Sequence, residues 1–203
     1  MVTSSGRRKI APRRLPGVER RALIESAAAR LFAERGFQDT TVEDICAAAG
    51  VSKPILYRHF ESKQELCMLL LERRRDQLAA APLGRFLESE GTVQQRLEAM
   101  IDAWFEHVAE HPDSSRLLFR DITGDAVLQE RQQELRRRQR AADVAMMREF
   151  GPPLGEEELE PLGEIIRSSL TGLALWWLER PAVPRAVVVH AMLRMLRGLL
   201  AER

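Results

Sequence analysis

The 203-residue sequence predicts an all-α protein of about nine helices, and three observations carry this expectation. Apolar residues recur every three or four positions through most of the chain, which is the period of an amphipathic helix. Hydroxyl or carboxylate residues precede several of these segments, and Gly or Pro follows them, as at helix starts and stops. No stretch shows the alternation of a strand bounded by hairpin turns.

The composition limits the class of protein. The chain is 45% hydrophobic and 30% charged with a formal net charge of +1, so a basic surface has to be local. The basic N-terminal start is not followed by an apolar run, and no apolar run is long enough to span a bilayer. Cys46 and Cys67 lack the spacing of a zinc site or a disulfide framework. These features predict a cytoplasmic protein that does not enter a membrane.

Residues 1–16 hold five basic residues and no acidic one, with Pro12 and Pro16 among them. This composition predicts a disordered basic arm. One interpretation is an arm that reaches DNA phosphates or a minor groove. The other interpretation is a solvated tail that makes no specific contact.

The first helix is expected from Val18 to Arg35, and Gly36 is expected to end it. Its apolar positions form a broad stripe, so it is predicted to pack across two short helices that follow. Those short helices cannot bury a core alone. The other apolar residues of this small core are expected to be Phe37, Val42, Ile45, Val51, Leu56, Phe60 and Leu66.

The segment from Thr40 to Glu65 has the pattern of a helix-turn-helix. Thr40 and Thr41 each stand three residues before a carboxylate, which is the capping-box spacing at a helix start. Gly50 is expected to end that helix in a left-handed conformation, and Ser52 to cap the next helix. Two helices joined by a tight glycine-containing turn form the motif whose second helix enters the DNA major groove.

These residues resemble the DNA-binding module of the TetR family of bacterial transcriptional regulators. The resemblance rests on Thr-Thr-Val-x-Asp-Ile, Ala-Gly-Val-Ser-Lys and Leu-Tyr-x-His-Phe-x-Ser-Lys-x-x-Leu, and it runs from Arg20 to Leu66. It implies a three-helix DNA-binding domain at residues 17–64. A helical domain for effector binding and dimerisation is then expected at residues 65–203.

The predicted recognition helix carries groups that suit DNA. Ammonium groups and hydroxyls bind phosphates, while apolar groups meet thymine methyls. The resemblance implies backbone contacts from five positions and places residues 52–55 against base edges; Pro54 and Ile55 stand where many relatives carry Gly-Thr or Pro-Thr. The predicted DNA-binding residues are Thr41, Ser52, Lys53, Pro54, Ile55, Tyr57, His59 and Lys63.

A connecting helix is predicted from Lys63 to Ala80. Ser62 and Glu65 have the capping-box spacing at its start, and Pro82 with Gly84 is expected to end it. Its mixed apolar and basic faces suit a rod that joins the two domains.

Three helical segments are expected in the middle of the chain. Thr92 is predicted to cap a helix that Pro112 stops. A short apolar-aromatic segment covers residues 115–123, and Asp125 is predicted to cap a long helix that reaches Phe150.

The last two helices, expected at about residues 156–179 and 184–202, each carry two apolar rows. Two apolar faces imply burial on both sides, either inside one domain or against a second subunit. The TetR resemblance implies the second alternative, a four-helix interface of a homodimer. The predicted interface residues are Ile166, Leu173, Trp177, Val189, Leu193 and Leu196.

Aromatic and thioether side chains gather in the second domain. A pocket lined by such groups is the usual small-molecule site, although helical spacing also fits ordinary core packing. The resemblance favours a cavity for a small-molecule effector, and no cofactor is expected. The predicted lining residues are Trp104, His107, Phe119, Met147 and Trp176.

Two further patterns are interpreted as ordinary surface. His107 and His111 have the i, i+4 spacing of a metal-binding pair, but no third ligand is evident beyond nearby carboxylates such as Glu110. No metal site is therefore predicted. The basic run at residues 136–140 is predicted to be a solvated helix face.

Together these patterns predict a ligand-responsive transcriptional regulator, interpreted as a repressor that binds a palindromic operator in double-stranded DNA as a dimer. A small-molecule effector would release it. An activator or a partner-regulated DNA-binding protein is the alternative, because the DNA module would look the same. An enzyme is disfavoured and no catalytic residue is predicted, since the sequence shows no phosphate loop, nucleophile–base set or paired carboxylates.

Overall fold

The structure is a computed structural model that describes residues 17–151 and 154–201. Within these residues the predicted all-α fold with nine helices is confirmed, and no strand occurs. The predicted basic arm, residues 1–16, lies outside the described residues. In chain order the helices are α1 (Gly17–Arg35), α2 (Val42–Ala49), α3 (Lys53–His59), α4 (Lys63–Glu88), α5 (Val93–Glu110), α6 (Pro112–Phe119), α7 (Ala126–Phe150), α8 (Glu156–Leu178) and α9 (Arg185–Ala201).

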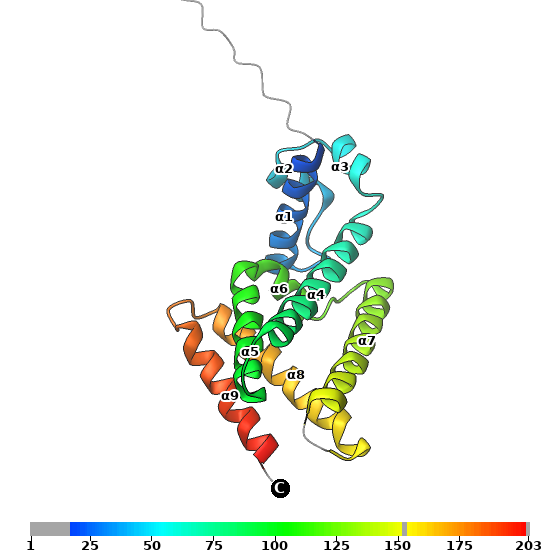
Figure 1. Ribbon diagram of the computed structural model, residues 1–203. Helices are drawn as coiled ribbons and strands as arrows, with labels where there is room; N and C mark the ends of the chain where they lie inside the picture. Colours follow the sequence, from blue (N-terminus) through cyan, green and yellow to red (C-terminus); the bar gives the residue numbers. More distant parts are fainter. Residues whose placement is uncertain (1–16, 152–153, 202–203) are drawn as a thin grey trace, which may run out of the picture.

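Helices α1, α2 and α3 form a small unit at one end of the molecule, which we call the head (Figure 1). Helix α4 leaves the head and runs diagonally into the remaining helices, α5 to α9, which we call the body (Figure 1). Helix α6 lies where the two parts meet and packs against both α1 and α4. The long helix α4 is therefore the segment through which the chain passes from the head into the body, and it packs against helices of both.

The turns of the head follow from local capping. Thr41 accepts a hydrogen bond from the Asp44 N–H at 3.1 Å, and the Asp44 carboxylate accepts one from the Thr41 N–H at 2.9 Å. Thr40 is instead buried, and its hydroxyl donates to the Gly36 carbonyl at 2.8 Å. Gly50 ends α2 with a φ of +65°, which side chains other than glycine rarely adopt. The capping box is thus confirmed at Thr41 rather than at Thr40.

Helix α4 extends beyond its predicted end because Pro82 does not stop it. The helix continues to Glu88, where the Ser89 N–H donates to the Arg85 carbonyl at 3.1 Å. A proline removes one helical hydrogen bond, but its ring here is buried, and so is Phe86 one turn later. Contact between α4 and α5 continues past the proline, because Arg96 of α5 donates to the Phe86 carbonyl at 2.9 Å.

Pro112 starts a helix as well as ending one. It occupies the first turn of α6, where a missing N–H costs nothing, so this helix covers residues 112–119 rather than 115–123. His111 is the residue that separates α5 from α6. The corner places α6 against α1, which joins body and head.

Buried side chains form two cores that divide inside α4. Residues up to Leu71 of α4 belong to the core of the head, together with Leu117, Ile122 and Leu128 from α6, its following loop and α7. Leu78 of α4 belongs to the core of the body. The helices of the head thus depend on side chains from beyond residue 64 for their burial.

Among the described helices, none combines the length and the apolarity that crossing a membrane requires.

Candidate nucleic-acid interface and ligand cavity

Helix α3 is anchored on one side and exposed on the other. Leu56 is fully buried in the core of the head, whereas Tyr57 is 50% exposed. Ile55 and His59 are half-buried on the flanks of the helix. The predicted DNA-binding residues that are exposed on or beside α3 are Ser52, Lys53, Pro54 and Tyr57.

Lys53 forms an ion pair with Glu43, so α2 and α3 are joined by charge as well as by packing. The hydrogen bond raises the pKa of Lys53 and lowers the pKa of Glu43. Both side chains are exposed, so the ammonium group can exchange this carboxylate for a phosphate oxygen.

Lys63 has a structural role that the sequence did not indicate. Its ammonium group donates to the carbonyls of Phe37 and Thr40, both at 2.8 Å, and lies 4.1 Å from the centre of the Phe37 ring. Two of its three N–H groups therefore hold the loop between α1 and α2. Thr41 lies in the same loop, exposed at the start of α2, with its hydroxyl donating to Asp44 at 2.6 Å.

A cavity of about 950 Å³ lies in the body, lined mainly by α4, α5, α7 and α8. Among the predicted lining residues, Trp104, Phe119 and Met147 lie on its wall. Trp104 and Phe119 stack with their ring centres 5.7 Å apart and an interplanar angle of 19°. The volume is within the range of small-molecule sites.

His107 and Trp176 were also predicted to line the cavity, and the structure places both elsewhere. Trp176 is 42% exposed on α8, with the Arg180 guanidinium carbon 4.7 Å from its ring centre. His107 lies at the C-terminal end of α5, where Arg74 contacts its carbonyl. The aromatic composition of a helix does not determine which of its faces borders a cavity.

A chain of polar side chains crosses one part of the cavity wall. Arg75 of α4 makes two long contacts to the Gln139 side-chain oxygen of α7, at 3.4 and 3.5 Å. The Gln139 amide in turn donates to Asp143 at 2.7 Å. On α8, Arg167 pairs with Glu164. All five residues line the cavity, so its wall is not uniformly apolar.

Burial changes the charge properties of this polar chain. Removal from water raises the pKa of Asp143, although Gln139 and two nearby guanidinium groups oppose the change. Burial also lowers the pKa of Arg75. Both shifts show that water solvates these ionic groups poorly.

The basic run at residues 136–140 was predicted to be a solvated face, and the structure shows that only part of it is. Arg137 and Arg138 are exposed and bond Glu134 at 3.1 and 2.9 Å. Arg140 is exposed as well, although it borders the cavity, whereas Arg136 is half-buried on the cavity wall. Successive residues of a helix point about 100° apart, so a contiguous run cannot share one face.

The same geometry separates residues 73–75, three consecutive arginines on α4. Arg73 is exposed and pairs with Glu25 of α1 at 2.9 Å. Arg74 is only 2% exposed and donates to the His107 carbonyl at 2.6 Å and the Ser115 hydroxyl at 3.1 Å. Arg74 thereby joins α4, α5 and α6, and burial lowers its pKa to about 10. Nothing in a sequence of three consecutive arginines indicates that the middle one is buried.

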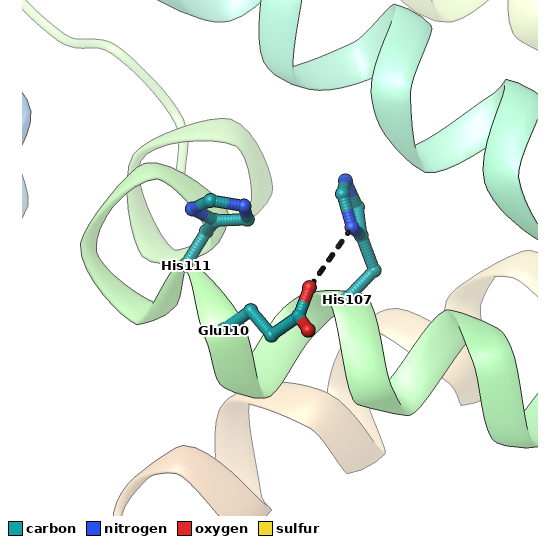
Figure 2. A group of neighbouring side chains, drawn as sticks. All are labelled: His107, Glu110 and His111. Atoms are coloured by element: carbon teal, nitrogen blue, oxygen red, sulfur yellow. Dashed lines mark ion pairs between the residues drawn. The ribbon is translucent and has the colours of Figure 1, made fainter.

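His107, Glu110 and His111 come together at the end of α5 (Figure 2). Their candidate ligand atoms lie within 4.8 Å of one another. Among the carboxylates near the two histidines, Glu110 is therefore the one placed where a third metal ligand would have to lie. Burial lowers the pKa of both imidazoles, and the positive charge of Arg74 lowers them further. That charge would also repel a metal cation, and the absence of a metal site stays a prediction.

Most of the residues predicted for the subunit interface are covered within the subunit itself. Trp177, Val189, Leu193 and Leu196 are buried inside the subunit, because α9 packs along α5 and Trp177 donates to the Val183 carbonyl at 2.7 Å. Ile166 and Leu173 are half-buried against the same core. Among the side chains of α8 and α9 that the structure describes, the large apolar ones that remain exposed are Ile165 (45%), Trp176 (42%) and Val187 (52%).

The anchored, outward-facing α3 and the helical body with a cavity define a helix-turn-helix regulator. Two family models match the chain: "Bacterial regulatory proteins, tetR family" over residues 24–67 and "Tetracyclin repressor-like, C-terminal domain" over residues 92–200. The chain belongs to the TetR family of DNA-binding transcriptional regulators, as the sequence resemblance predicted.

Named relatives agree with this assignment. The chain is 38% identical over 106 residues to the "HTH-type transcriptional activator FasR" of Mycolicibacterium smegmatis, covering 52% of this chain and 48% of that protein. It is 36% identical over 102 residues to the "HTH-type transcriptional repressor KstR2" of Mycobacterium tuberculosis, covering 50% of each. The matches thus span about half the length of these curated relatives.

A solved TetR-like transcriptional regulator from Rhodococcus sp. RHA1 superimposes with a TM-score of 0.75. That match covers 94% of this chain and 100% of the other at 21% identity, and it supports the fold alone.

Proposed function

We propose that the protein acts as a homodimeric transcriptional repressor that binds a palindromic operator and releases it when a small molecule fills the cavity. The observation that carries the proposal is the arrangement of α3, held by buried Leu56 while Tyr57 and the residues before it stay exposed. A recognition helix needs this combination of a fixed axis and a free outer face. A cytoplasmic site of action follows from this role.

In this proposal the start of α3 enters the major groove. Ser52, Pro54 and Ile55 meet base edges, with the apolar pair suited to thymine methyls. Lys53, Tyr57 and Thr41 bind phosphates, while His59, half-buried beside Phe60, supplies a ring N–H at the edge of the contact. Lys63 contributes mainly by holding the loop that presents Thr41.

Dimerisation is proposed to use the outer faces of α8 and α9. Ile165, Gly172 and Trp176 follow one another on the exposed side of α8, and Val187 is exposed near the start of α9. Large exposed apolar side chains on adjacent helices favour association with a second copy. A two-fold dimer would present two recognition helices to half-sites about 34 Å apart.

Effector control is proposed to act through α4. This helix follows α3 after a short turn, and its residues Leu71, Arg75 and Leu78 line the cavity. A ligand that contacts these residues shifts α4 only if it prefers one of its positions over another. Movement of α4 then changes the spacing of the two recognition helices.

The direction of regulation is proposed from the release mechanism. One relative is named an activator and another a repressor, so the family name alone leaves both modes available. Operator release by an effector corresponds to a repressor. A promoter assay with and without the selected operator measures the sign directly.

Selection of binding sites from random duplex DNA tests the proposal. We expect the native protein to recover a palindrome, and a Lys53→Gln/Tyr57→Phe variant to bind every duplex more weakly, because phosphate contacts carry little sequence information. Arg137→Gln, on the exposed face of α7, is the matched control and should leave selection unchanged. Failure of the native protein to select any motif would refute the proposal. Lys63 is not a suitable site for this test, because its loss would also release the loop.

A further inference from the structure

We infer that the cavity takes an amphipathic monoanion, with its acidic head between Arg75 and Arg167 and its apolar body against Trp104, Met146 and Met147. This inference rests on the proposed function, since it names the chemical class of the effector that the cavity admits. It adds the headgroup site, which is built from residues of three different helices.

The apolar part of the cavity selects for a hydrocarbon or similarly apolar body. Aliphatic, aromatic and thioether side chains of α5 and α7, including Leu97, Met100 and Phe150, form this wall. Thioether side chains adapt to the shape of an apolar ligand, because they are unbranched and flexible. A fully polar solute would leave this surface poorly covered.

The charged part of the cavity carries a surplus of one positive charge. Its cations are Arg75, Arg136, Arg140 and Arg167, and its carboxylates are Asp121, Asp143 and Glu164, which gives four against three. Arg136 is compensated by Asp121 at 2.7 Å. The remaining set holds three guanidinium groups and two carboxylates, so one anionic group on a ligand would balance it.

Arg75 is the cation with the weakest compensation. Among the described residues it pairs with no carboxylate, and its hydrogen bonds to neutral Gln139 are at the long limit, 3.4 and 3.5 Å. The Nε atom of Arg167 is buried and lacks a hydrogen-bond partner among the described residues. A buried donor without a partner is costly, so Arg167 gains when an acceptor arrives, and Arg75 can exchange its long contacts for shorter charge-assisted hydrogen bonds.

Contacts with α7 bring these two groups to the same stretch of the cavity wall. Gln139 of α7 contacts Arg75 of α4, and the next residue, Arg140, lies 3.9 Å from Glu164 of α8, which pairs with Arg167. The Asp143 carboxylate, one turn further along α7 and bonded to Gln139 at 2.7 Å, also interacts electrostatically with both guanidinium groups. A carboxylate or phosphate head is the natural partner of a guanidinium group, which donates two parallel hydrogen bonds to such an anion. A fatty carboxylate and an alkyl phosphate both carry such a head, an acidic group with anionic oxygens, on an apolar body.

The test compares four probes of equal chain length: dodecanoate, dodecyl phosphate, dodecanol and dodecyltrimethylammonium. Binding to the full chain is measured by calorimetry below the concentration at which the probes form micelles. Intrinsic tryptophan fluorescence, to which Trp104 on the cavity wall contributes together with Trp176 and Trp177, follows the same titrations. We expect dodecanoate to bind at least about tenfold more tightly than dodecanol, the factor for one charge-assisted hydrogen bond. Tighter binding of dodecyl phosphate, whose charge approaches −2 at neutral pH, would identify a phosphate ester as the source of the head and overturn the assignment of a monoanion.

Variants of Arg75 separate charge from folding. Arg75→Gln should remove the preference for dodecanoate over dodecanol while dodecanol affinity stays the same, and Arg75→Lys should keep part of the preference. Arg137→Gln is the matched control, since its side chain is exposed and does not line the cavity. Melting temperatures of all variants show whether the fold is retained.

Equal affinities for dodecanoate and dodecanol, or tighter binding of the ammonium probe, would overturn the inference. Absence of binding by all four probes would overturn it together with the effector part of the proposed function. Selective dodecanoate binding that leaves operator binding intact would refute effector release alone, and the headgroup site would stand.

Discussion

The head and the body of this protein use helices in opposite ways. The head packs helices of seven and eight residues, α3 and α2, against α1 around side chains such as Ile24, Ile45 and Leu56 that are fully buried. In the body, α7 and α8 together with the connecting helix α4, which have 23 to 26 residues each, surround a cavity of about 950 Å³. Short helices have to be supported by dense packing, whereas long helices tolerate an unfilled space between them.

This difference gives the head a rigid structure and the body a cavity that can accept a ligand. The head fixes the axis of α3, as recognition of a regular DNA groove requires. The body keeps half-buried ionic groups such as Arg75 and Asp143 on the wall of its cavity, where ligand contacts can offset the cost of their partial removal from water. Four predictions test the comparison, beginning with the largest expected effect.

Truncation in the two regions should have unequal costs. Phe60 is 1% exposed in the core of the head, so Phe60→Ala should lower the free energy of unfolding by about 3–5 kcal/mol. Met147 is half-buried on the cavity wall, and Met147→Ala should cost less than about 2 kcal/mol, since its site is already partly empty. Urea unfolding followed by circular dichroism measures both. Equal losses would mean that the cavity wall is packed as densely as the head.

The outer face of the body is tested by Ile165→Glu. A charge on this exposed position should leave the subunit folded but weaken dimerisation by about 2 kcal/mol or more, because the carboxylate would be buried between subunits. Sedimentation velocity measures the dimer. Leu193→Glu is the contrasting variant, and it should unfold the subunit because Leu193 is buried within it. A dimer that is unchanged by Ile165→Glu would place the interface elsewhere.

Replacing a glycine by alanine should change the free energy of unfolding in opposite directions in the head and in the second half of α4. Gly50→Ala should destabilise the head by about 1–2 kcal/mol, because its φ of +65° strains a residue with a Cβ atom. Gly84→Ala, inside α4 with open space around the new Cβ, should stabilise the protein by up to about 1 kcal/mol. Thermal melting of both variants gives the signs. Two changes of the same sign would contradict the expected difference.

The smallest effect is expected for Asp143→Asn. Burial raises the pKa of Asp143, so the folded state keeps this proton to higher pH than the unfolded chain does. Stability contributed by this group therefore falls as pH rises through that range, and the Asn variant should melt at a slightly higher temperature at neutral pH. An asparagine oxygen can still accept the hydrogen bond from Gln139. The advantage should disappear in acid, and a pH-independent difference would reject this explanation.

Features that depend on a few neighbouring residues were predictable. The Thr41 capping box, the left-handed Gly50 and the Asp125 cap of α7 each involve groups within three residues of one another. Local hydrogen bonds and backbone conformation determine them, so their spacing in the sequence was sufficient. The positions of the head helices, and with them the exposed face of α3, followed from the same signals.

Features that depend on which helices face one another were not predictable. Pro82 was expected to end α4, but burial of its ring against the body keeps the helix continuous. Trp176 and Trp177 are neighbours with similar chemistry, yet one is exposed and the other lies in the core. A helical pattern identifies two apolar faces but does not state which neighbour covers each.

The sequence by itself determined the helical class, the helix-turn-helix and part of its exposed surface, because capping and periodicity are encoded over short distances. Only the tertiary structure decided where the cavity lies, that Arg75 and Arg167 both line it, and which faces of α8 and α9 remain exposed. These features arise from contacts between helices that are far apart in the chain. Packing and desolvation, which no local pattern records, select among the faces that each helix offers.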